Sequence, residues 1–153
     1  MSAYDNIHHL LGRPKERNAA QMSAVTLAYM GDAVYDLYVR ALLVELSDAT
    51  ARGLHMRAAK LVCASAQAAA SVAVLPLFNE QESAIFRRGR NAHMGTTAKN
   101  ASIADYRAAT GLEAVIGYLF LSGDDSRLEE LMRVILADLL KTEPSPDDAQ
   151  PTT

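Results

Sequence analysis

The chain contains two segments that combine an acid with glycine, Ala28-Tyr-Met-Gly-Asp-Ala-Val-Tyr35 and, much later, Gly111-Leu-Glu-Ala-Val-Ile-Gly117. Each segment places a single carboxylate, Asp32 or Glu113, in an otherwise apolar helical stretch. An unpaired buried carboxylate costs on the order of several kcal/mol, and a glycine inside a helix costs roughly 1 kcal/mol relative to alanine. We therefore predict that two helices cross closely at these glycines and hold the two acids together around a shared metal ion.

Each acid also has a plainer interpretation, because an isolated Asp or Glu commonly lies exposed on an amphipathic helix. The glycines favour the paired interpretation, since Gly117 lies four residues after Glu113 and therefore on the same helix face. Converging carboxylates repel each other unless a cation neutralises them. Hard oxygen ligands favour Mg²⁺, whose coordination is completed by water and substrate phosphate. The pair thus predicts a Mg²⁺ site suited to phosphodiester hydrolysis, in which we expect Mn²⁺ to substitute.

The rest of the chain predicts an all-α fold. Its 153 residues fit one domain, half of them are hydrophobic, and glycine and proline are scarce. Apolar residues recur at helical spacing and polar residues that cap helices precede several of the apolar stretches. We expect one helical domain over residues 19–141, between a flexible N-terminal segment (1–18) and a disordered tail (142–153). The six expected helices are 20–46, 50–62, 64–74, 80–90, 102–121 and 126–140.

Composition also limits the compartment. No apolar run is long enough for a membrane span, and the N-terminus lacks the layout of a signal peptide. The single cysteine, Cys63, supports neither an intrachain disulfide nor a cysteine-based zinc site. Its neighbours Val62 and Ala64 predict an inert thiol in the core. We expect a cytoplasmic protein with no membrane partner.

One basic segment lies on an otherwise acidic chain. The net charge is −3, but residues 87–107 contain five basic side chains and one acidic side chain, a net +4 that leaves −7 for the remainder. Arginine, lysine and amide side chains beside a glycine-containing loop are groups that hold phosphates without reading bases. A solvated, charged helix end is the alternative. No Phe, Tyr or Trp alternates with the basic and amide residues of 88–100, as it would in a segment that stacks single-stranded bases, so duplex RNA is the better fit.

Three segments together resemble Mini-ribonuclease III, the short bacterial branch of the ribonuclease III family that lacks a double-stranded-RNA-binding domain. These segments are Leu27-Ala-Tyr-Met-Gly-Asp-Ala-Val-Tyr-Asp-Leu-Tyr-Val-Arg40, Arg87-Arg-Gly-Arg-Asn-Ala92 and Gly111-Leu-Glu-Ala-Val-Ile-Gly-Tyr-Leu-Phe-Leu121. The likeness extends over roughly residues 20–140. It implies a helical homodimer with a valley for double-stranded RNA and Mg²⁺-dependent endonuclease activity. In this branch it also implies maturation of precursor 23S ribosomal RNA, free or within the immature large subunit.

The resemblance assigns roles to individual positions. Asp32 matches the family's catalytic aspartate, and Glu113 matches its metal-binding glutamate, so both are expected to act in catalysis and to bind metal. The helical spacing of Tyr29, Tyr35 and Tyr38 predicts core or dimer contacts, with contacts to RNA as the alternative. The residues expected to bind RNA are Arg88, Arg90, Asn91, His93, Lys99, Asn100 and Arg107.

Two positions depart from full-length ribonucleases III. Ala28 and Thr110 stand where that group usually carries acids, and both replacements look typical of the Mini branch. They leave two acids per site where four are usual, so Thr110, Glu82 or Asp105 could complete the site. His93 stands where lysine is more usual in this branch.

Two rival functions follow from the same residues. A non-catalytic RNA-binding or ribosome-assembly module is favoured by the missing acids, and a helical phosphohydrolase acting on free nucleotides would also use a metal site. Retention of both Asp32 and Glu113 counts against the binding module. The basic segment counts against a small substrate.

Overall fold

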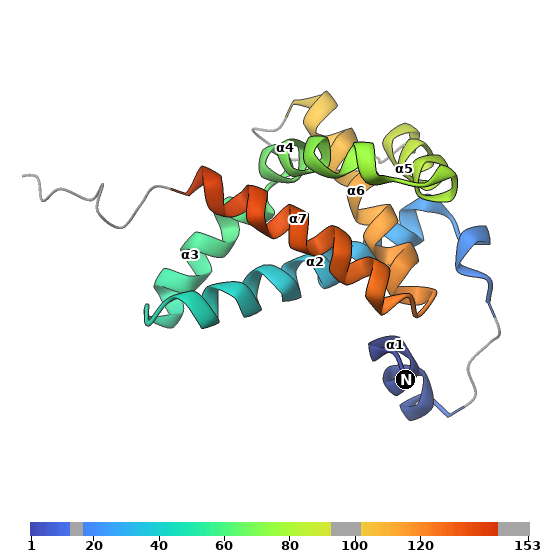
Figure 1. The fold of residues 1–153 in the computed structure, drawn as a ribbon, viewed down its shortest axis with the longest axis horizontal. Coiled ribbons are helices and arrows are strands. Elements are labelled where there is room, and N and C mark those ends of the chain that lie inside the picture. The colour runs from blue at the N-terminus through green and yellow to red at the C-terminus, as the bar shows by residue number, and fades with distance from the viewer. Residues whose placement is uncertain (13–16, 93–101, 144–153) are drawn as a thin grey trace, which may run out of the picture.

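The computed structural model describes residues 1–12, 17–92 and 102–143. Within these ranges the chain forms seven α-helices, two short 3-10 helices and no β-strand, which confirms the predicted all-α class (Figure 1). The elements in chain order are α1 (Ala3–Leu10), η1 (Ala19–Gln21), α2 (Ala24–Leu46), α3 (Ala51–Val62), α4 (Ala64–Val74), η2 (Leu75–Leu77), α5 (Glu80–Asn91), α6 (Ile103–Leu121) and α7 (Asp125–Thr142).

Local capping explains most of the helix bounds. The side chains of Thr50 and Ser102 accept hydrogen bonds from the backbone N–H groups of Gly53 and Asp105, so α3 and α6 begin where the sequence predicted. The start of α2 differs from the prediction. Ser23 caps this helix, and the residues just before it form the separate turn η1.

The first helix, α1, folds back onto the end of α6. A capping box between Ser2 and Asp5 starts it. The backbone N–H of Ala3 donates to Asp125 at 3.0 Å, and the ring of Tyr4 meets Phe120 edge-on with centroids 5.7 Å apart. The beginning of the chain is therefore attached to the core, while the predicted tail from residue 144 onward lies outside the described residues.

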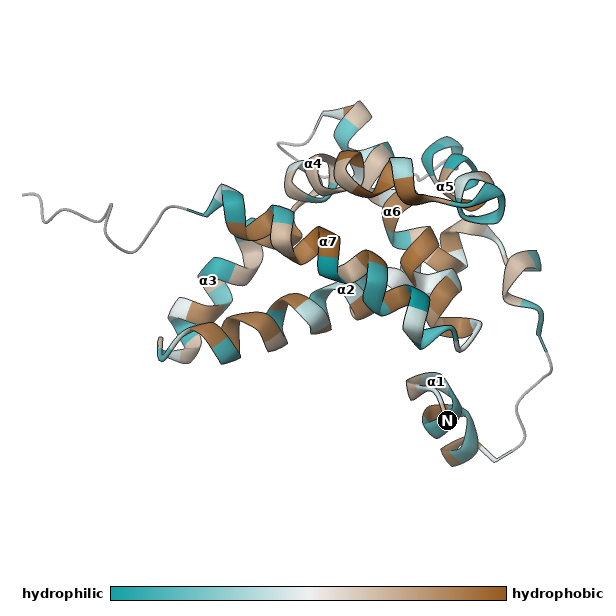
Figure 2. Ribbon diagram, viewed as in Figure 1, coloured by the Kyte–Doolittle hydropathy of each residue, from teal (hydrophilic) through white to brown (hydrophobic). Residues whose placement is uncertain are grey.

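The helix α6 is the centre of the core. Ten of its residues are buried, and α2, α4, α5 and α7 all pack against it. Figure 2 shows hydrophobic colour along much of α6 and α2, and hydrophilic colour over much of α5. This arrangement places the middle of α6, which carries Glu113, between α2 and α4.

The prediction that Cys63 lies in the core is wrong. Cys63 is exposed, because it caps the start of α4 at the bend between α3 and α4 instead of facing the core. Leu37 and Val44, which continue the apolar pattern of α2, are 64% and 61% exposed. No single helix in the described ranges is long and apolar enough to cross a membrane, although α3 and α4–η2 pass that test together as a pair bent by 58°.

Candidate active site

Two glycines allow α2 and α6 to cross with their backbones in contact. A Cβ atom added to Gly31 would lie 1.7 Å from the carbonyl oxygen of Glu113, and one added to Gly117 would lie 1.9 Å from that of Leu27. Real Cβ contacts are never this short, so no other residue fits at either position without moving a helix. The predicted close crossing is present, and it sets the position of Glu113 relative to α2.

The crossing brings the two predicted acids together. Asp32 lies exposed on α2, and Glu113 lies half-buried on α6. Burial raises the pKa of the Glu113 carboxyl group well above its usual range, and the nearby carboxyl group of Asp32 raises it further. An acid held in this way binds either a proton or a cation readily, which is the electrostatic condition for a metal site.

A third polar side chain contacts this pair, and the sequence interpretation did not include it. Gln67 on α4 donates a hydrogen bond of 3.0 Å from its Nε2 to Glu113 Oε1, which acts to lower the pKa of Glu113. Tyr35 lies close enough that the charge of Glu113 helps to raise its pKa, although burial is the main cause. The available signal was a single glutamine in the alanine-rich stretch 64–74.

The two positions where longer relatives carry acids do not supply charge here. Ala28 is buried in the crossing at 3% exposure, and Thr110 is buried at 4%. The Thr110 hydroxyl donates to the carbonyl oxygen of Tyr106 at 2.9 Å, within its own helix. Its proton is therefore used by the α6 backbone, and its oxygen can only accept a hydrogen bond.

The other two acids considered from the sequence lie elsewhere. Glu82 is buried and forms an ion pair with Arg127 at 2.8 Å. Asp105 lies in the first turn of α6, two turns or about 12 Å along the helix from Glu113 at 1.5 Å per residue. Among the described residues, no group of three or more His, Cys, Asp or Glu side chains is placed to hold a metal ion.

The donor atoms at the crossing nevertheless fit a hard divalent cation. Two carboxylates and a nearby amide are all oxygen-bearing groups. Mg²⁺ is commonly bound through only one or two protein carboxylates, with water and substrate phosphate in the remaining positions. Asp32 and Glu113 are the residues that would hold it.

The predicted RNA-binding residues fall into three groups. Arg90, Asn91 and Arg107 are exposed. Arg88 donates to the carbonyl oxygens of Ala20 and Met22, at 3.1 and 2.6 Å, so part of its guanidinium holds η1 in place. The predicted positions His93, Lys99 and Asn100 lie outside the described residues.

The basic end of α5 is fixed to the helix that carries Glu113. A Cβ atom added to Gly89 would lie 2.8 Å from the Cα of Gly111 and 3.0 Å from the carbonyl oxygen of Thr110. The helices α5 and α6 therefore also cross at a pair of glycines. Because this crossing is adjacent to Glu113, the arginines of α5 belong to the same structural unit as the acid pair.

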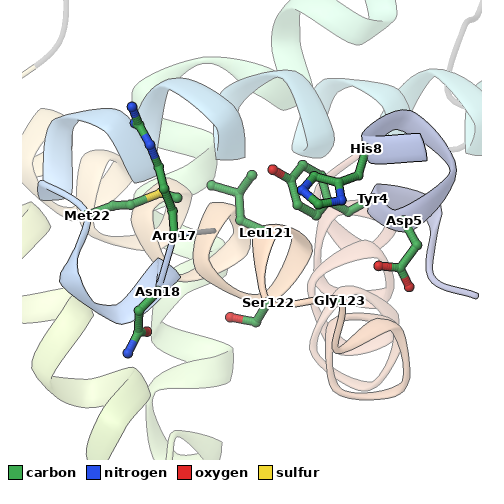
Figure 3. A pocket seen from close by; sticks show the side chains of 9 residues that line it. All are labelled: Tyr4, Asp5, His8, Arg17, Asn18, Met22, Leu121, Ser122 and Gly123. Atoms are coloured by element: carbon green, nitrogen blue, oxygen red, sulfur yellow. The ribbon is translucent and has the colours of Figure 1, made fainter. Parts of the chain in front are cut away.

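A separate hollow of about 460 Å³ lies between α1, the segment before η1 and the end of α6. Figure 3 shows its lining, with Tyr4 and His8 side by side on α1 and Arg17 and Met22 across from them. Leu121 in this hollow is two helical turns beyond Glu113. Among the described residues that line it, the one acid is Asp5, whose carboxylate caps α1, so this lining shows no pair of acids like that of the crossing.

Comparison with known proteins agrees with this geometry. Residues 25–124 match the model of the ribonuclease III domain. The chain is 43% identical to the Mini-ribonuclease 3 of Clostridium tetani over 122 residues. This aligned region covers 79% of this chain and 81% of that protein. The chain belongs to the ribonuclease III family, in its Mini-ribonuclease 3 branch. It is also 43% identical to the Mini-ribonuclease 3 of Enterococcus faecalis, over 76% of this chain and 89% of that one.

A solved structure shows the same fold. A protein from Fusobacterium nucleatum, solved by X-ray crystallography, superposes with a TM-score of 0.72 over 80% of this chain and 98% of its own, at 21% identity. As a ribonuclease III family member, the protein is an endoribonuclease that acts on double-stranded RNA, and the family generally uses divalent metal ions.

Proposed function

We propose that this endoribonuclease depends on Mg²⁺ held by Asp32 and Glu113, with Mn²⁺ able to substitute. The observation that carries the proposal is the helix crossing made by glycines, which places Asp32 close enough to Glu113 to raise its pKa. A divalent cation at such a site supplies an activated water and neutralises charge that develops during phosphodiester hydrolysis.

The chain's own residues would divide the remaining work. Asp32 is exposed and faces solvent, from which the RNA backbone approaches. Glu113 is half-buried and anchored on the central helix, so its carboxyl group has little freedom to move. The rigid crossing fixes both oxygen donors before substrate binds, which lowers the entropic cost of reaching a reactive geometry.

The basic groups near the site support binding of the duplex backbone. Exposed Arg90 and Asn91 end α5, and Arg107 lies on the exposed side of α6. Cations of this kind contact phosphates and position a duplex without reading its sequence. We include Arg88 with its remaining donors, and His93, Lys99 and Asn100 from the sequence prediction.

A homodimer is part of the proposal. Along α2, Val25, Tyr29, Leu37 and Val44 are 42%, 82%, 64% and 61% exposed, an unusual number of large apolar side chains for one solvent-facing helix. A second copy covering part of this face would bury them. It would also place two acid pairs on one duplex, one for each strand. Sedimentation of the wild type and of Tyr29→Asp tests the homodimer. We expect the wild type to sediment as a dimer and Tyr29→Asp to dissociate, and a wild type that stays monomeric would contradict the proposal.

The natural substrate in the proposal is precursor 23S ribosomal RNA in the cytoplasm. The support is the likeness to the Mini branch over most of the chain. Incubation with precursor fragments that contain the paired ends of the large-subunit RNA, beside a random duplex of equal length, tests it. Preferred cleavage at defined positions in the paired ends is expected. Equal, unselective cleavage of both RNAs would count against this substrate.

The acid pair is tested with Asp32→Asn, measured on long double-stranded RNA with Mg²⁺ and with a chelator. The wild type should cleave only with Mg²⁺, and the variant should bind the duplex without shortening it. Asp36→Asn is the matched control, because Asp36 lies one turn along the same helix and its one side-chain partner among the described residues is Arg40. Full cleavage by Asp32→Asn would refute the assignment.

The binding-module alternative keeps one observation in its favour, the loss of charge at Ala28 and Thr110 described above. It predicts that duplex RNA is bound but stays intact under all metal conditions. The same assay therefore separates the two functions.

A further inference from the structure

Gln67 is a buried amide that donates one hydrogen bond to Glu113 of the acid pair and one to the backbone. Its side chain is on α4 and is 2% exposed. Nε2 donates to the carbonyl oxygen of Val62 and to Glu113 Oε1, each at 3.0 Å. A primary amide has two N–H bonds, so no further donor is left. Exchanging the nitrogen and oxygen would face Oε1 toward two acceptors, and the hydrogen-bond partners therefore fix the orientation of the amide.

The oxygen of the same amide has no partner. Gln67 Oε1 is buried and accepts no hydrogen bond from any described residue. Buried carbonyl oxygens in folded proteins are nearly always paired, with protein groups or with water. This oxygen is bonded to the carbon that carries Nε2, so it lies near the carboxyl group of Glu113. An acceptor next to a metal-binding acid is suited to a donor that arrives with the cation, namely a water molecule of its hydration shell.

The contacts of Gln67 also connect the three helices around the site. The carbonyl oxygens of Leu61 and Val62 belong to the last turn of α3, where backbone acceptors lack partners within the helix. Tyr35, three residues after Asp32 on α2, donates its hydroxyl to Leu61 at 3.2 Å, and Gln67 donates to Val62. The end of α3 thus links the helix of Asp32 to the amide that holds Glu113.

We propose that Gln67 is a positioning residue of the metal site, which orients the Glu113 carboxylate for a divalent cation and accepts a hydrogen bond from cation-bound water. This inference rests on the proposed function, because it assumes that Asp32 and Glu113 bind the cation. It explains how a site with two acids can hold a cation firmly. A neutral amide fixes one acid without adding a charge that the cation must offset. Groups that orient metal ligands typically change metal affinity about 10- to 100-fold when removed.

The first experiment measures Mn²⁺ binding by electron paramagnetic resonance on the full chain, without RNA. Gln67→Met keeps the length and apolar contacts of the side chain but removes both donors and the oxygen. The matched control is Ser71→Ala, one turn further along α4. Ser71 is equally buried, and in the described part of the chain its hydroxyl bonds to Ala68 of its own helix and to no other group. We expect Gln67→Met to weaken Mn²⁺ binding by about tenfold or more, and Ser71→Ala to leave it unchanged.

The outcomes separate this inference from the proposed function. Unchanged Mn²⁺ affinity in Gln67→Met, with binding still abolished by Asp32→Asn, would overturn the role of Gln67 and leave the metal site standing. Equal Mn²⁺ affinity in the wild type and in Asp32→Asn would overturn both the role of Gln67 and the proposed metal site. A lower melting temperature of Gln67→Met with wild-type affinity would show that the amide only stabilises the α3–α4 junction.

A second measurement needs no variant at Gln67. In ¹⁵N-labelled wild-type protein, the side-chain amide resonances of Gln67 should shift as Mg²⁺ is added, along the same binding curve as the backbone signal of Glu113. Side-chain resonances that stay in place while Glu113 responds would contradict the proposal even if Gln67→Met does not fold.

Discussion

Glu82 and Glu113 are carried by helices of the same core, yet their surroundings are opposite. Burial acts to raise the pKa of Glu82, but hydrogen bonds from Arg127 and from the backbone of Asn79 outweigh it and lower the pKa. Glu113 faces the carboxyl group of Asp32 instead, and no salt bridge to it is found in the described part of the chain. Its pKa is raised.

The difference in partners indicates a different role for each glutamate. A buried acid that serves stability is paired with a cation of the protein, as Glu82 is with Arg127. An acid left facing another acid lowers the stability of the metal-free fold, and such arrangements concentrate at functional sites. Four experiments test this difference between the two glutamates.

Neutralising Glu113 should greatly reduce catalysis, whereas neutralising Glu82 should leave it almost unchanged. We expect Glu113→Gln to reduce cleavage of double-stranded RNA by about a thousandfold or more, beyond the 10- to 100-fold typical of residues that only orient a ligand. Glu82→Gln should lower stability and leave the cleavage rate per folded molecule within about threefold of wild type. Single-turnover rates at saturating Mg²⁺ measure both. Similar rates for the two variants would erase the distinction.

The glycine crossing beside Glu113 should be the part of the core that least tolerates an added methyl group. Gly31→Ala places a methyl group against the Glu113 backbone, so we expect a loss of more than about 3 kcal/mol in the free energy of unfolding, or no folding. Gly53→Ala in α3 is the control. Its added Cβ would meet only side-chain atoms at 3.3 Å or more, and alanine favours helix by up to about 1 kcal/mol. Urea unfolding curves compare them.

Removing the partner of Glu82 should expose the cost of an unpaired buried charge. Arg127→Met breaks the ion pair and leaves a carboxylate of 1% side-chain exposure without its cation. We expect a loss of about 3 kcal/mol in the free energy of unfolding, with Mn²⁺ binding unchanged. Arg133→Met, at an exposed arginine on the same helix, should change stability by less than about 0.5 kcal/mol. Equal losses in both would mean that the pair does not stabilise the fold.

The pH dependence of stability should carry opposite signs at the two sites. Below pH 4.5, the ordinary value for Glu113, folded and unfolded chains both bind its proton. As the pH rises, the unfolded chain releases the proton first, so the free energy of unfolding falls until the raised folded-state pKa is passed. With chelator present, we expect wild type to lose on the order of 1 kcal/mol relative to Glu113→Gln between pH 4.5 and about pH 8.

Glu82 provides the reverse case. Its lowered folded-state pKa contributes stability that is present above pH 4.5 and is lost as the pH falls through the folded-state value. Wild type and Glu82→Gln should therefore converge in acid, whereas wild type and Glu113→Gln should diverge toward neutral pH. Parallel curves for all three proteins would show that neither carboxyl group titrates differently on folding.

Much of this fold could be predicted from local sequence. The caps Thr50 and Ser102 and the apolar stretches that follow them set α3 and α6, because capping and periodicity act within a few residues. The close crossing could also be predicted, since paired glycines inside apolar helices have few other uses. Both acids of the candidate site came from the same two segments.

The partners of polar side chains could not be predicted in this way. Gln67, the pairing of Glu82 with Arg127 and the contacts of Arg88 with η1 all join elements far apart in the chain. The exposure of Cys63 depends on the bend between α3 and α4, which its apolar neighbours do not reveal. Each of these features depends on how helices pack.

Residue types and their spacing set the helices, the glycines that let two of them touch, and the acids beside those glycines, because these properties depend on each helix alone. Only the tertiary structure decided which acid received a cation from the protein and which did not. It also decided that a glutamine from a third helix would hold Glu113. Electrostatic pairing and burial depend on distances between elements, and packing around α6 sets those distances.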